Sequence, residues 1–330
     1  MRILITGGCG FIGSQFVRLA VGRGHEVVNV DKLTYAGNPA NVADVAGDPG
    51  YRFVHADIAD AEAMAGAMAG VEVVVNFAAE SHVDRSILTP GEFIHTDVVG
   101  TAVLLDAART AGVRRFVQVS TDEVYGSIQE GAFRETDPIQ PSSPYSASKA
   151  GGDLQVLAWH RTFGIDAVIT RGSNTFGARQ YPEKLIPLFV TNALDGESLP
   201  VYGDGMQVRD WIHVEDHCEG IWTAMEAGVA GEVYNVGGGN EVPNIEITRR
   251  ILAATGAGED LIRHVGDRLG HDRRYALATD KLRGLGWAPR HGFDEALAAT
   301  VAWYADNRTW WEPIKSGEYR AYYETQYGNR

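Results

Sequence analysis

The sequence predicts an α/β protein in which a doubly wound parallel sheet is followed by a second, smaller α/β domain. Short β-type runs alternate with helical patterns over the first half of the chain, and most of these runs are rich in apolar residues. Continuous apolar strands are typical of a parallel sheet that helices cover on both faces. After about Gly172 the alternation loosens and prolines separate shorter elements, which indicates a change of architecture.

The expected elements follow in a regular order. We expect strands at residues 2–6, 26–30, 51–55, 71–77, 115–120 and 167–171, and helices at 11–23, 61–68, 91–111 and 145–163. The first domain is therefore placed at residues 1–172, with about 212–237 returning to it, and residues 173–330 form mainly a second, substrate-binding domain. The cleft between two such domains is the default ligand site. The tail 310–330 is rich in Trp and Tyr, and we expect it to pack against the protein.

Composition restricts the possible partners and the cellular compartment. The chain has 330 residues and a formal net charge of −14, which argues against nucleic acid or an anionic membrane as the main partner. Its two cysteines, Cys9 and Cys218, are too few for a disulfide framework. No apolar stretch approaches the roughly 18 residues of a membrane span. These features predict a cytoplasmic protein that acts on a small molecule.

A glycine-rich turn predicts a dinucleotide site. Gly7, Gly10 and Gly13 lie where the first strand ends and the first helix begins, so the backbone can approach a pyrophosphate at the helix N-terminus. Asp31 ends the next strand, where a carboxylate accepts hydrogen bonds from a ribose diol and repels a 2′-phosphate. This favours NAD over NADP, although Lys32 beside it weakens the preference. The first domain is therefore predicted to be a Rossmann-type fold.

Two further motifs predict the chemistry. Tyr145 and Lys149 lie four residues apart on a predicted helix and face the same way, so the ammonium can lower the pKa of the phenol. Asp122 and Glu123 follow Thr121 at the end of a central strand. Adjacent acids are often only a solvated loop, but this location favours a second proton transfer beside the hydride chemistry.

Four longer strings carry a resemblance to a known family. They are Ala78-Ala79-Glu80-Ser81-His82-Val83-Asp84-Arg85-Ser86, Ser120-Thr121-Asp122-Glu123-Val124-Tyr125-Gly126, Tyr145-Ser146-Ala147-Ser148-Lys149 and Pro182-Glu183-Lys184-Leu185-Ile186-Pro187. The chain resembles the extended short-chain dehydrogenases/reductases (the NAD-dependent epimerase/dehydratase family), and within them the nucleoside-diphosphate-glucose 4,6-dehydratases. The resemblance runs over nearly the whole chain.

The resemblance implies a reaction and a role for each catalytic residue. A nucleoside-diphosphate glucose, dTDP-glucose first, is oxidised at C4, loses water across C5–C6 and receives the hydride back at C6, so NAD is recycled. Tyr145 would deprotonate the C4 hydroxyl, Lys149 would lower its pKa and hold the nicotinamide ribose, and Thr121 would hydrogen-bond the C4 oxygen. Glu123 would be the base at C5 and Asp122 the acid at the C6 hydroxyl.

The resemblance also implies two sets of binding residues and a homodimer. The cofactor set is Gly7, Gly10, Phe11, Ile12, Gly13, Asp31, Lys32, Thr34, Asp57, Ile58, Ala78, Ala79, Ser81, Thr96, Ser120, Tyr145 and Lys149. The substrate set is Ser81, Asn174, Lys184, Leu185, Pro200, Tyr202, Arg209, Asn244, Arg268, His271 and Tyr275. From the residues alone, Asp57 either reaches the adenine or caps the following turn.

Three other interpretations are open at this point. A 4-epimerase or a nucleotide-sugar decarboxylase of the same superfamily would not need Asp122, and a non-catalytic NAD sensor would not need the Tyr–Lys pair. The string Thr175-Phe176-Gly177-Ala178 departs from the family pattern, and we expect its changes to line the approach to the nicotinamide and the sugar. No Cys/His spacing indicates a metal site, so none is predicted.

Overall fold

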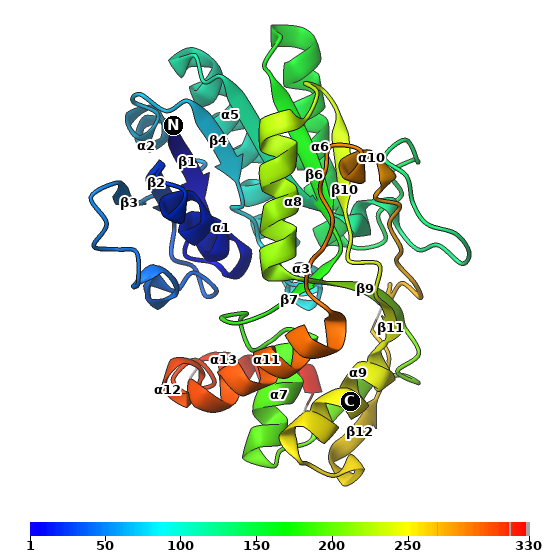
Figure 1. The fold of residues 1–330 in the computed structure, drawn as a ribbon. Coiled ribbons are helices and arrows are strands. Elements are labelled where there is room, and N and C mark those ends of the chain that lie inside the picture. Colours follow the sequence, from blue (N-terminus) through cyan, green and yellow to red (C-terminus); the bar gives the residue numbers. More distant parts are fainter. Residues whose placement is uncertain (269, 317, 328–330) are drawn as a thin grey trace.

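A seven-stranded parallel sheet forms the centre of the larger part of the molecule (Figure 1). The computed structural model describes residues 1–268, 270–316 and 318–327. The strand order is β3-β2-β1-β4-β5-β6-β10, and every pair in it is parallel. The strands are β1 Arg2–Thr6, β2 Glu26–Asp31, β3 Tyr51–His55, β4 Val73–Asn76, β5 Arg115–Thr121, β6 Ala167–Gly172 and β10 Val233–Val236. The predicted fold class is thereby confirmed.

Helices cover both faces of this sheet. On one face, α1 (Phe11–Gly22) and α8 (Val214–Ala227) bury an apolar core that includes Phe16 and Ile221. On the other face, α2 (Ala61–Ala67), α5 (Thr101–Ala111) and α6 (Pro144–Phe163) bury a separate apolar core. The inner strands are thus covered on both faces, which explains their many apolar residues, whereas the edge strand β3 has exposed positions such as Phe53.

The helical segment expected at 91–111 is divided. It comprises α4 (Pro90–Ile94), a π-helical turn η2 (His95–Gly100) and α5. The helix α3 (Val83–Leu88), which was not expected, precedes it. Thr89 lies between α3 and α4, because the residue before a proline disfavours the helical region.

The smaller part of the molecule consists of two short sheets and several helices. Its core includes Phe189, Ile247, Val301 and Tyr304. Its strands are β7 Asn174–Phe176, β8 Leu199–Tyr202, β9 Val208–His213, β11 Glu241–Pro243 and β12 Ile262–Val265. Its helices are α7 Leu185–Asp195, α9 Asn244–Thr255, α11 Phe293–Asp306, α12 Arg308–Trp311 and α13 Glu318–Tyr327. The remaining short helices are η1 Pro39–Val42, η3 Asp122–Tyr125, η4 Glu259–Leu261 and α10 Asp280–Arg283.

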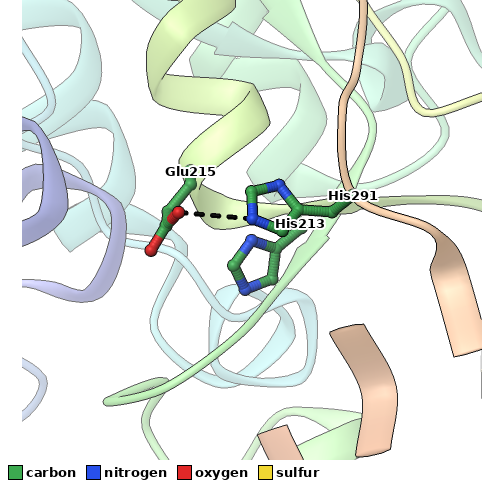
Figure 2. Close-up of side chains that lie close together, drawn as sticks. All are labelled: His213, Glu215 and His291. Atoms are coloured by element: carbon green, nitrogen blue, oxygen red, sulfur yellow. Dashed lines mark ion pairs between the residues drawn. The ribbon is translucent and has the colours of Figure 1, made fainter. Parts of the chain in front are cut away.

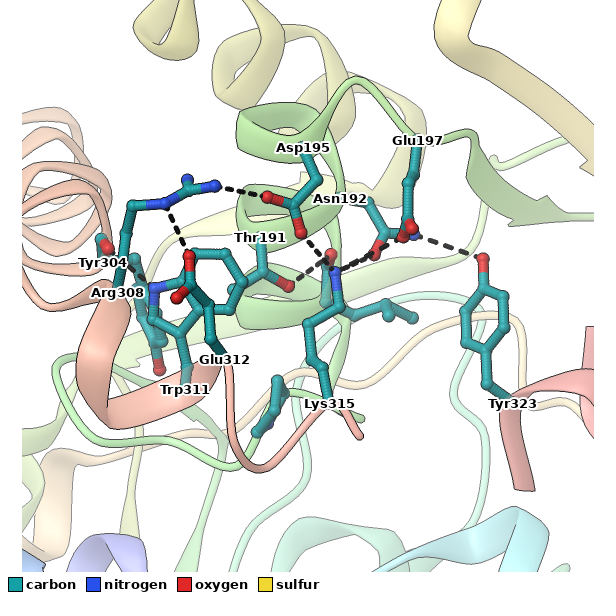
Figure 3. A network of polar contacts seen from close by, with 12 residues as sticks. Thr191, Asn192, Asp195, Glu197, Tyr304, Arg308, Trp311, Glu312, Lys315 and Tyr323 are labelled. Atoms are coloured by element: carbon teal, nitrogen blue, oxygen red, sulfur yellow. Dashed lines mark hydrogen bonds and ion pairs between the residues drawn. The ribbon is translucent and has the colours of Figure 1, made fainter. Parts of the chain in front are cut away.

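The C-terminal tail packs on α7, as expected for the described part of 310–330. Trp311 is fully buried. Lys315 Nζ lies 3.1 Å from Asn192 Oδ1 and 3.2 Å from Asp195 Oδ2, and Arg308 also pairs with Asp195 (Figure 3). Residues 328–330 lie outside the described residues. Among the helices of the described ranges, none is both long and apolar enough to cross a membrane.

Candidate active site

The first cleft lies at the switch point of the sheet, where β1 and β4 are neighbours and the strand order reverses. Gly7 has φ +66°, and a Cβ on it would lie 2.8 Å from the Ala78 nitrogen. A Cβ on Gly13 would lie 2.2 Å from the Gly7 oxygen. The N-terminus of α1, with Gly10 as its N-cap, receives no side-chain cap. The first N–H groups of α1 are therefore suited to bind a pyrophosphate.

A carboxylate and an ion pair form the adenosine end of this cleft. Asp31 accepts hydrogen bonds from the backbone N–H groups of Cys9 (2.9 Å) and Leu33 (2.8 Å), which fix the orientation of its carboxylate. Lone pairs remain for a ribose diol. Lys32 Nζ lies 2.7 Å from Asp57 Oδ2, and Asp57 also accepts a hydrogen bond from the Ala59 N–H. The carboxylate of Asp57 thus offsets the charge of Lys32 that was expected to weaken the preference for NAD.

Every residue expected to contact the cofactor lines this cleft. The residues are Gly7, Gly10, Phe11, Ile12, Gly13, Asp31, Lys32, Thr34, Asp57, Ile58, Ala78, Ala79, Ser81, Thr96, Ser120, Tyr145 and Lys149. The predicted catalytic residues Thr121, Asp122 and Glu123 line the same cleft.

Two local structures position the catalytic side chains. Thr121 ends β5 and caps η3, because its Oγ1 accepts a hydrogen bond from the Glu123 N–H at 3.2 Å. The helix α6 begins with Pro144 and has a capping box between Ser143 and Ser146. A proline at the first position and a reciprocal cap both fix where a helix begins. The first turn of α6 therefore holds Tyr145 at the same cleft as η3.

Asp122 lies in an environment that disfavours its charge. Its side chain is 2% exposed. Its Oδ1 accepts a hydrogen bond from Thr121 Oγ1 at 3.1 Å, whereas Oδ2 has no hydrogen-bond partner among the described residues. Burial raises the pKa of Asp122 well above its usual range, and the carboxylates of Glu123 and Asp210 raise it further. This environment favours a protonated Asp122 near neutral pH.

Glu123 differs from its neighbour because cations face it. Burial raises its pKa as well, but Arg268, Arg209 and Lys184 oppose that effect. Two adjacent carboxyl groups with different environments can take the roles of acid and base in one site. The arrangement therefore supports a proton donor at Asp122 and a proton acceptor at Glu123.

The pKa of Tyr145 shifts in the direction opposite to the one expected from sequence. Burial raises it well above the usual value, and the carboxylates of Glu123, Asp97 and Asp122 add to the rise. Lys149 Nζ donates a hydrogen bond to the Val119 carbonyl at 2.8 Å. In the protein without cofactor, burial and the surrounding carboxylates therefore outweigh the lowering of the Tyr145 pKa that was expected from Lys149.

A second hollow opens from the first. Both are lined by Glu123, Asn174 and Lys184. Arg268 Nε lies 3.8 Å from Asp84 Oδ1, and the guanidinium of Arg209 stacks 4.3 Å from the ring centroid of Tyr275. Apart from Ser81, which lines the first cleft, all the expected substrate residues line the second hollow: Asn174, Lys184, Leu185, Pro200, Tyr202, Arg209, Asn244, Arg268, His271 and Tyr275.

Comparison with known proteins identifies the family. The family model described as GDP-mannose 4,6 dehydratase matches residues 4–300. A dTDP-glucose 4,6-dehydratase from Streptomyces niveus is 54% identical over an alignment of 323 residues, and the match covers 96% of this chain and 96% of the relative. The chain belongs to the family of NAD-dependent nucleotide-sugar 4,6-dehydratases.

Solved structures support the same assignment. The dTDP-glucose 4,6-dehydratase DesIV from Streptomyces venezuelae, with NAD and TYD bound, is 54% identical and has a TM-score of 0.94. That match covers 96% of this chain and 100% of the DesIV chain. A UDP-glucose 4-epimerase of Thermus thermophilus in complex with NAD is 32% identical, with a TM-score of 0.87 and coverage of 93% and 100%. The dehydratases are thus closer to this chain than this epimerase is.

The stretch Thr175-Phe176-Gly177-Ala178, which departs from the family pattern, lies mostly outside the first cleft and the second hollow. Of its four residues only Thr175 lines the cleft. Phe176 is 1% exposed and packs edge-on against Trp211 and Phe293 in the core. The expectation that the changed residues line the approach to the nicotinamide and the sugar therefore holds for Thr175 but was wrong for Phe176 and Ala178. An aromatic residue at the end of a short strand could have indicated a core position.

Several cleft residues were not found from the sequence. Glu80 lines the cofactor cleft, and its burial and the carboxylates of Asp97 and Glu92 raise its pKa to about 7. His217 also lines this cleft, and its Nδ1 lies 2.7 Å from Thr175 Oγ1. Glu80 lies within the string Ala78–Ser86, which carries part of the family resemblance, but no role was assigned to it. His217 is one buried position of an amphipathic helix, which gives no signal of its own.

Proposed function

We propose that this protein dehydrates dTDP-glucose to its 4-keto-6-deoxy product, with NAD recycled in each turnover. The observation that carries the proposal is the carboxyl pair of Asp122 and Glu123 in one cleft with Tyr145 and Lys149. Relatives named dTDP-glucose 4,6-dehydratase at 53–54% identity support the reaction. The protein is accordingly an NAD-dependent hydro-lyase.

The glycine turn and Asp31 are suited to hold the cofactor. The absence of side chains at Gly7 and Gly13 lets a pyrophosphate approach the first turn of α1. When bound there, NAD⁺ would supply the hydride acceptor for C4 of the sugar and, once reduced, the hydride donor for C6. Lys149, which lines the same cleft, would hold the nicotinamide ribose. The solved relative with NAD bound supports this assignment.

Tyr145 and Thr121 both act on the C4 hydroxyl of the sugar. Tyr145 takes this proton, and Thr121 hydrogen-bonds the oxygen from the end of β5. Burial and the carboxylates of Glu123, Asp97 and Asp122 raise the pKa of Tyr145, which disfavours its phenolate in the protein without cofactor. A nearby positive charge favours the phenolate, so Tyr145 becomes a usable base only when a cation lies beside it.

Glu123 and Asp122 carry out the elimination. Glu123 removes the proton at C5, which the C4 ketone has made acidic, and gives a proton back to C5 when the hydride returns to C6. Asp122 gives its proton to the C6 hydroxyl, which leaves as water, because hydroxide alone is a poor leaving group. The raised pKa of Asp122 supports this role, since the carboxyl must still carry its proton when the substrate arrives.

The second hollow is suited to a nucleoside diphosphate. Arg209 and Arg268 bind the two phosphates, because a guanidinium pairs with phosphate oxygens in a bidentate manner. Tyr202 and His271 lie edge to face in the same hollow and offer apolar contact to a base. That the similar DesIV structure is named dTDP-glucose 4,6-dehydratase favours thymine as that base.

A direct assay tests this proposal. The purified protein is incubated separately with dTDP-glucose and with UDP-glucose, and the 4-keto product is measured. We expect rapid formation from dTDP-glucose and slower formation from UDP-glucose. A 4-epimerised sugar in place of the keto product would refute the dehydratase assignment.

We also infer the domain division and the location. Residues 1–172 with about 212–237 form the cofactor-binding part, and 173–330 form mainly the substrate-binding part. This is supported by β10, which pairs with β6 at the edge of the large sheet. The free, buried thiols of Cys9 and Cys218 support a reducing, cytoplasmic compartment.

A homodimer is supported by apolar side chains on neighbouring helices. Leu88, Ile94 and Leu154 are 58%, 56% and 56% exposed on α3, α4 and α6, which contact one another. Single exposed apolar residues are normal, but a group on adjacent helices is typical of an interface. Light scattering should give twice the 35.8 kDa of one chain. A monomer at micromolar concentration would contradict the dimer.

A further inference from the structure

Three potential metal ligands meet where β9 passes into α8. His213 ends β9, Glu215 lies in the first turn of α8, and His291 lies in the loop before α11. Figure 2 shows their side chains converging from these segments. One ligand atom from each residue lies within 4.8 Å of those of the other two. The residues belong to neither the cofactor cleft nor the substrate hollow.

The buried carboxylate of Asp216 fixes the orientation of His291. It accepts hydrogen bonds from the backbone N–H groups of Arg290 and His291, both at 3.0 Å. Its Oδ1 also lies 3.0 Å from His291 Nδ1. A ring nitrogen that donates to a carboxylate leaves the other nitrogen as the lone-pair donor. In the neutral ring, His291 Nε2 therefore presents a lone pair.

That lone pair faces another electron-pair donor. His291 Nε2 lies 3.3 Å from Glu215 Oε2. A neutral imidazole nitrogen and a carboxylate oxygen are both electron-pair donors, so this distance calls either for a second proton on the ring, as in an ion pair, or for a metal ion that both atoms bind. Two ligands at about 2.0–2.1 Å from a tetrahedral zinc ion are separated by about 3.3 Å, which is the spacing found here.

His213 supplies the third donor. Its Nδ1 is buried and has no hydrogen-bond partner among the described residues. Its Nε2 faces Gly177 on the opposite side, because a Cβ on that glycine would lie 3.4 Å from it. In Figure 2, one ring nitrogen of His213 faces His291. A buried nitrogen without a partner needs a proton donor or a metal to satisfy it.

We propose that His213, Glu215 and His291 bind a divalent transition-metal ion, zinc first. Two imidazole nitrogens and one carboxylate oxygen are a donor set that zinc accepts, with water in the fourth position. The side chains of His291 and Glu215 are 37% and 53% exposed, which gives the ion a path from solvent. Asp216 supplies the outer carboxylate that metal-bound histidines usually have.

The bound ion fastens two distant segments of the chain. It joins the β9–α8 junction to the loop that leads into α11, so residues 213 and 291 are held together. The site acts on stability, because binding to the folded state alone raises the free energy of unfolding. None of its ligands touches the proposed catalytic residues.

Zinc titration of the NAD-bound, tag-free protein tests the proposal. We expect one Zn²⁺ per chain by calorimetry and a melting temperature that rises with zinc and falls back with EDTA. Co²⁺ added in place of zinc should give the visible bands of a four-coordinate ion. No binding at one equivalent would overturn the proposal and would leave His291 as the partner of Glu215 and Asp216 in an ordinary ion pair.

Matched variants separate this site from incidental surface histidines. His213→Asn should weaken zinc binding at least tenfold and should remove the rise in melting temperature. His264→Asn changes an exposed histidine whose Nδ1 lies 2.8 Å from the Gly203 carbonyl oxygen, and it should bind zinc like the wild type. Unchanged circular dichroism and dehydratase activity in both variants would exclude misfolding. Equal zinc binding by His213→Asn and the wild type would overturn the proposal.

Discussion

Replacing Asp122 by asparagine separates the elimination step from the oxidation step. Asparagine has the same shape, and its amide oxygen can still accept the hydrogen bond from Thr121 Oγ1. Only the acidic proton is lost. General acids contribute about 10²–10⁴-fold to a rate, which corresponds to about 3–5 kcal/mol of the barrier. We expect a loss of dehydration in this range.

The assay follows both half-reactions in one sample. With dTDP-glucose, the variant should oxidise C4, so absorbance from reduced nicotinamide accumulates while the 4-keto-6-deoxy product forms slowly. Asp210→Asn is the matched control, because Asp210 is also buried and a carboxylate that raises the pKa of Asp122. Without the Asp210 carboxylate the pKa of Asp122 is lower. The control should therefore match the wild-type rate at low pH, and its activity should decline at a lower pH than that of the wild type as the pH is raised.

Stability gives an independent readout of the same pKa. Because the folded-state pKa of Asp122 is raised, folding favours the protonated carboxyl, and this stabilisation is lost as pH rises through the folded-state value. Asparagine does not titrate. The melting temperature of Asp122→Asn relative to the wild type should therefore rise with pH. Normal turnover by the variant would refute the acid role.

Three further substitutions test the binding and structural assignments. Arg268→Met should weaken nucleotide binding by about 10–100-fold, since a charged hydrogen bond contributes about 1.5–3 kcal/mol. As a control, Arg273→Met changes an exposed arginine and should leave the affinity for dTDP, measured by titration, unchanged. Asp153→Asn should lower the free energy of unfolding by about 3–5 kcal/mol in denaturant melts, because Arg171 would stay buried without the carboxylate that now lies 3.0 Å from its Nε. The double change Asp153→Leu with Arg171→Met should recover much of this loss. Gly13→Ala should abolish NAD retention during purification, because its Cβ would meet backbone at 2.2 Å; full NAD occupancy would contradict that geometry.

The order of strands and helices in the larger domain was predictable because each element has a strong local pattern. The apolar runs mark the strands, and the glycine turn marks the first crossover. The π-helical turn η2 was not predictable, because it depends on contact with another helix. Gly152 of α6 lies so close to Asp97 of η2 that a Cβ on this glycine would be 2.7 Å from the Asp97 carbonyl oxygen. No local pattern encodes such a contact.

The candidate site was predictable where a motif carries it and not where burial decides it. Tyr145 and Asp122 were found from spacing and position along the chain. The upward shift of the Tyr145 pKa was missed, because it depends on burial and on carboxylates from three other residues. His213 and His291 are far apart in sequence, and only the packing of the loop before α11 against α8 brings them together.

The central claim is that one hydride leaves C4 and returns to C6 of the same sugar. The measurement is turnover of dTDP-glucose deuterated at C4, with the product analysed by NMR. We expect deuterium at C6 of the 4-keto-6-deoxy product without addition of reduced cofactor. Product with an unlabelled C6, or deuterium released to solvent, would contradict it.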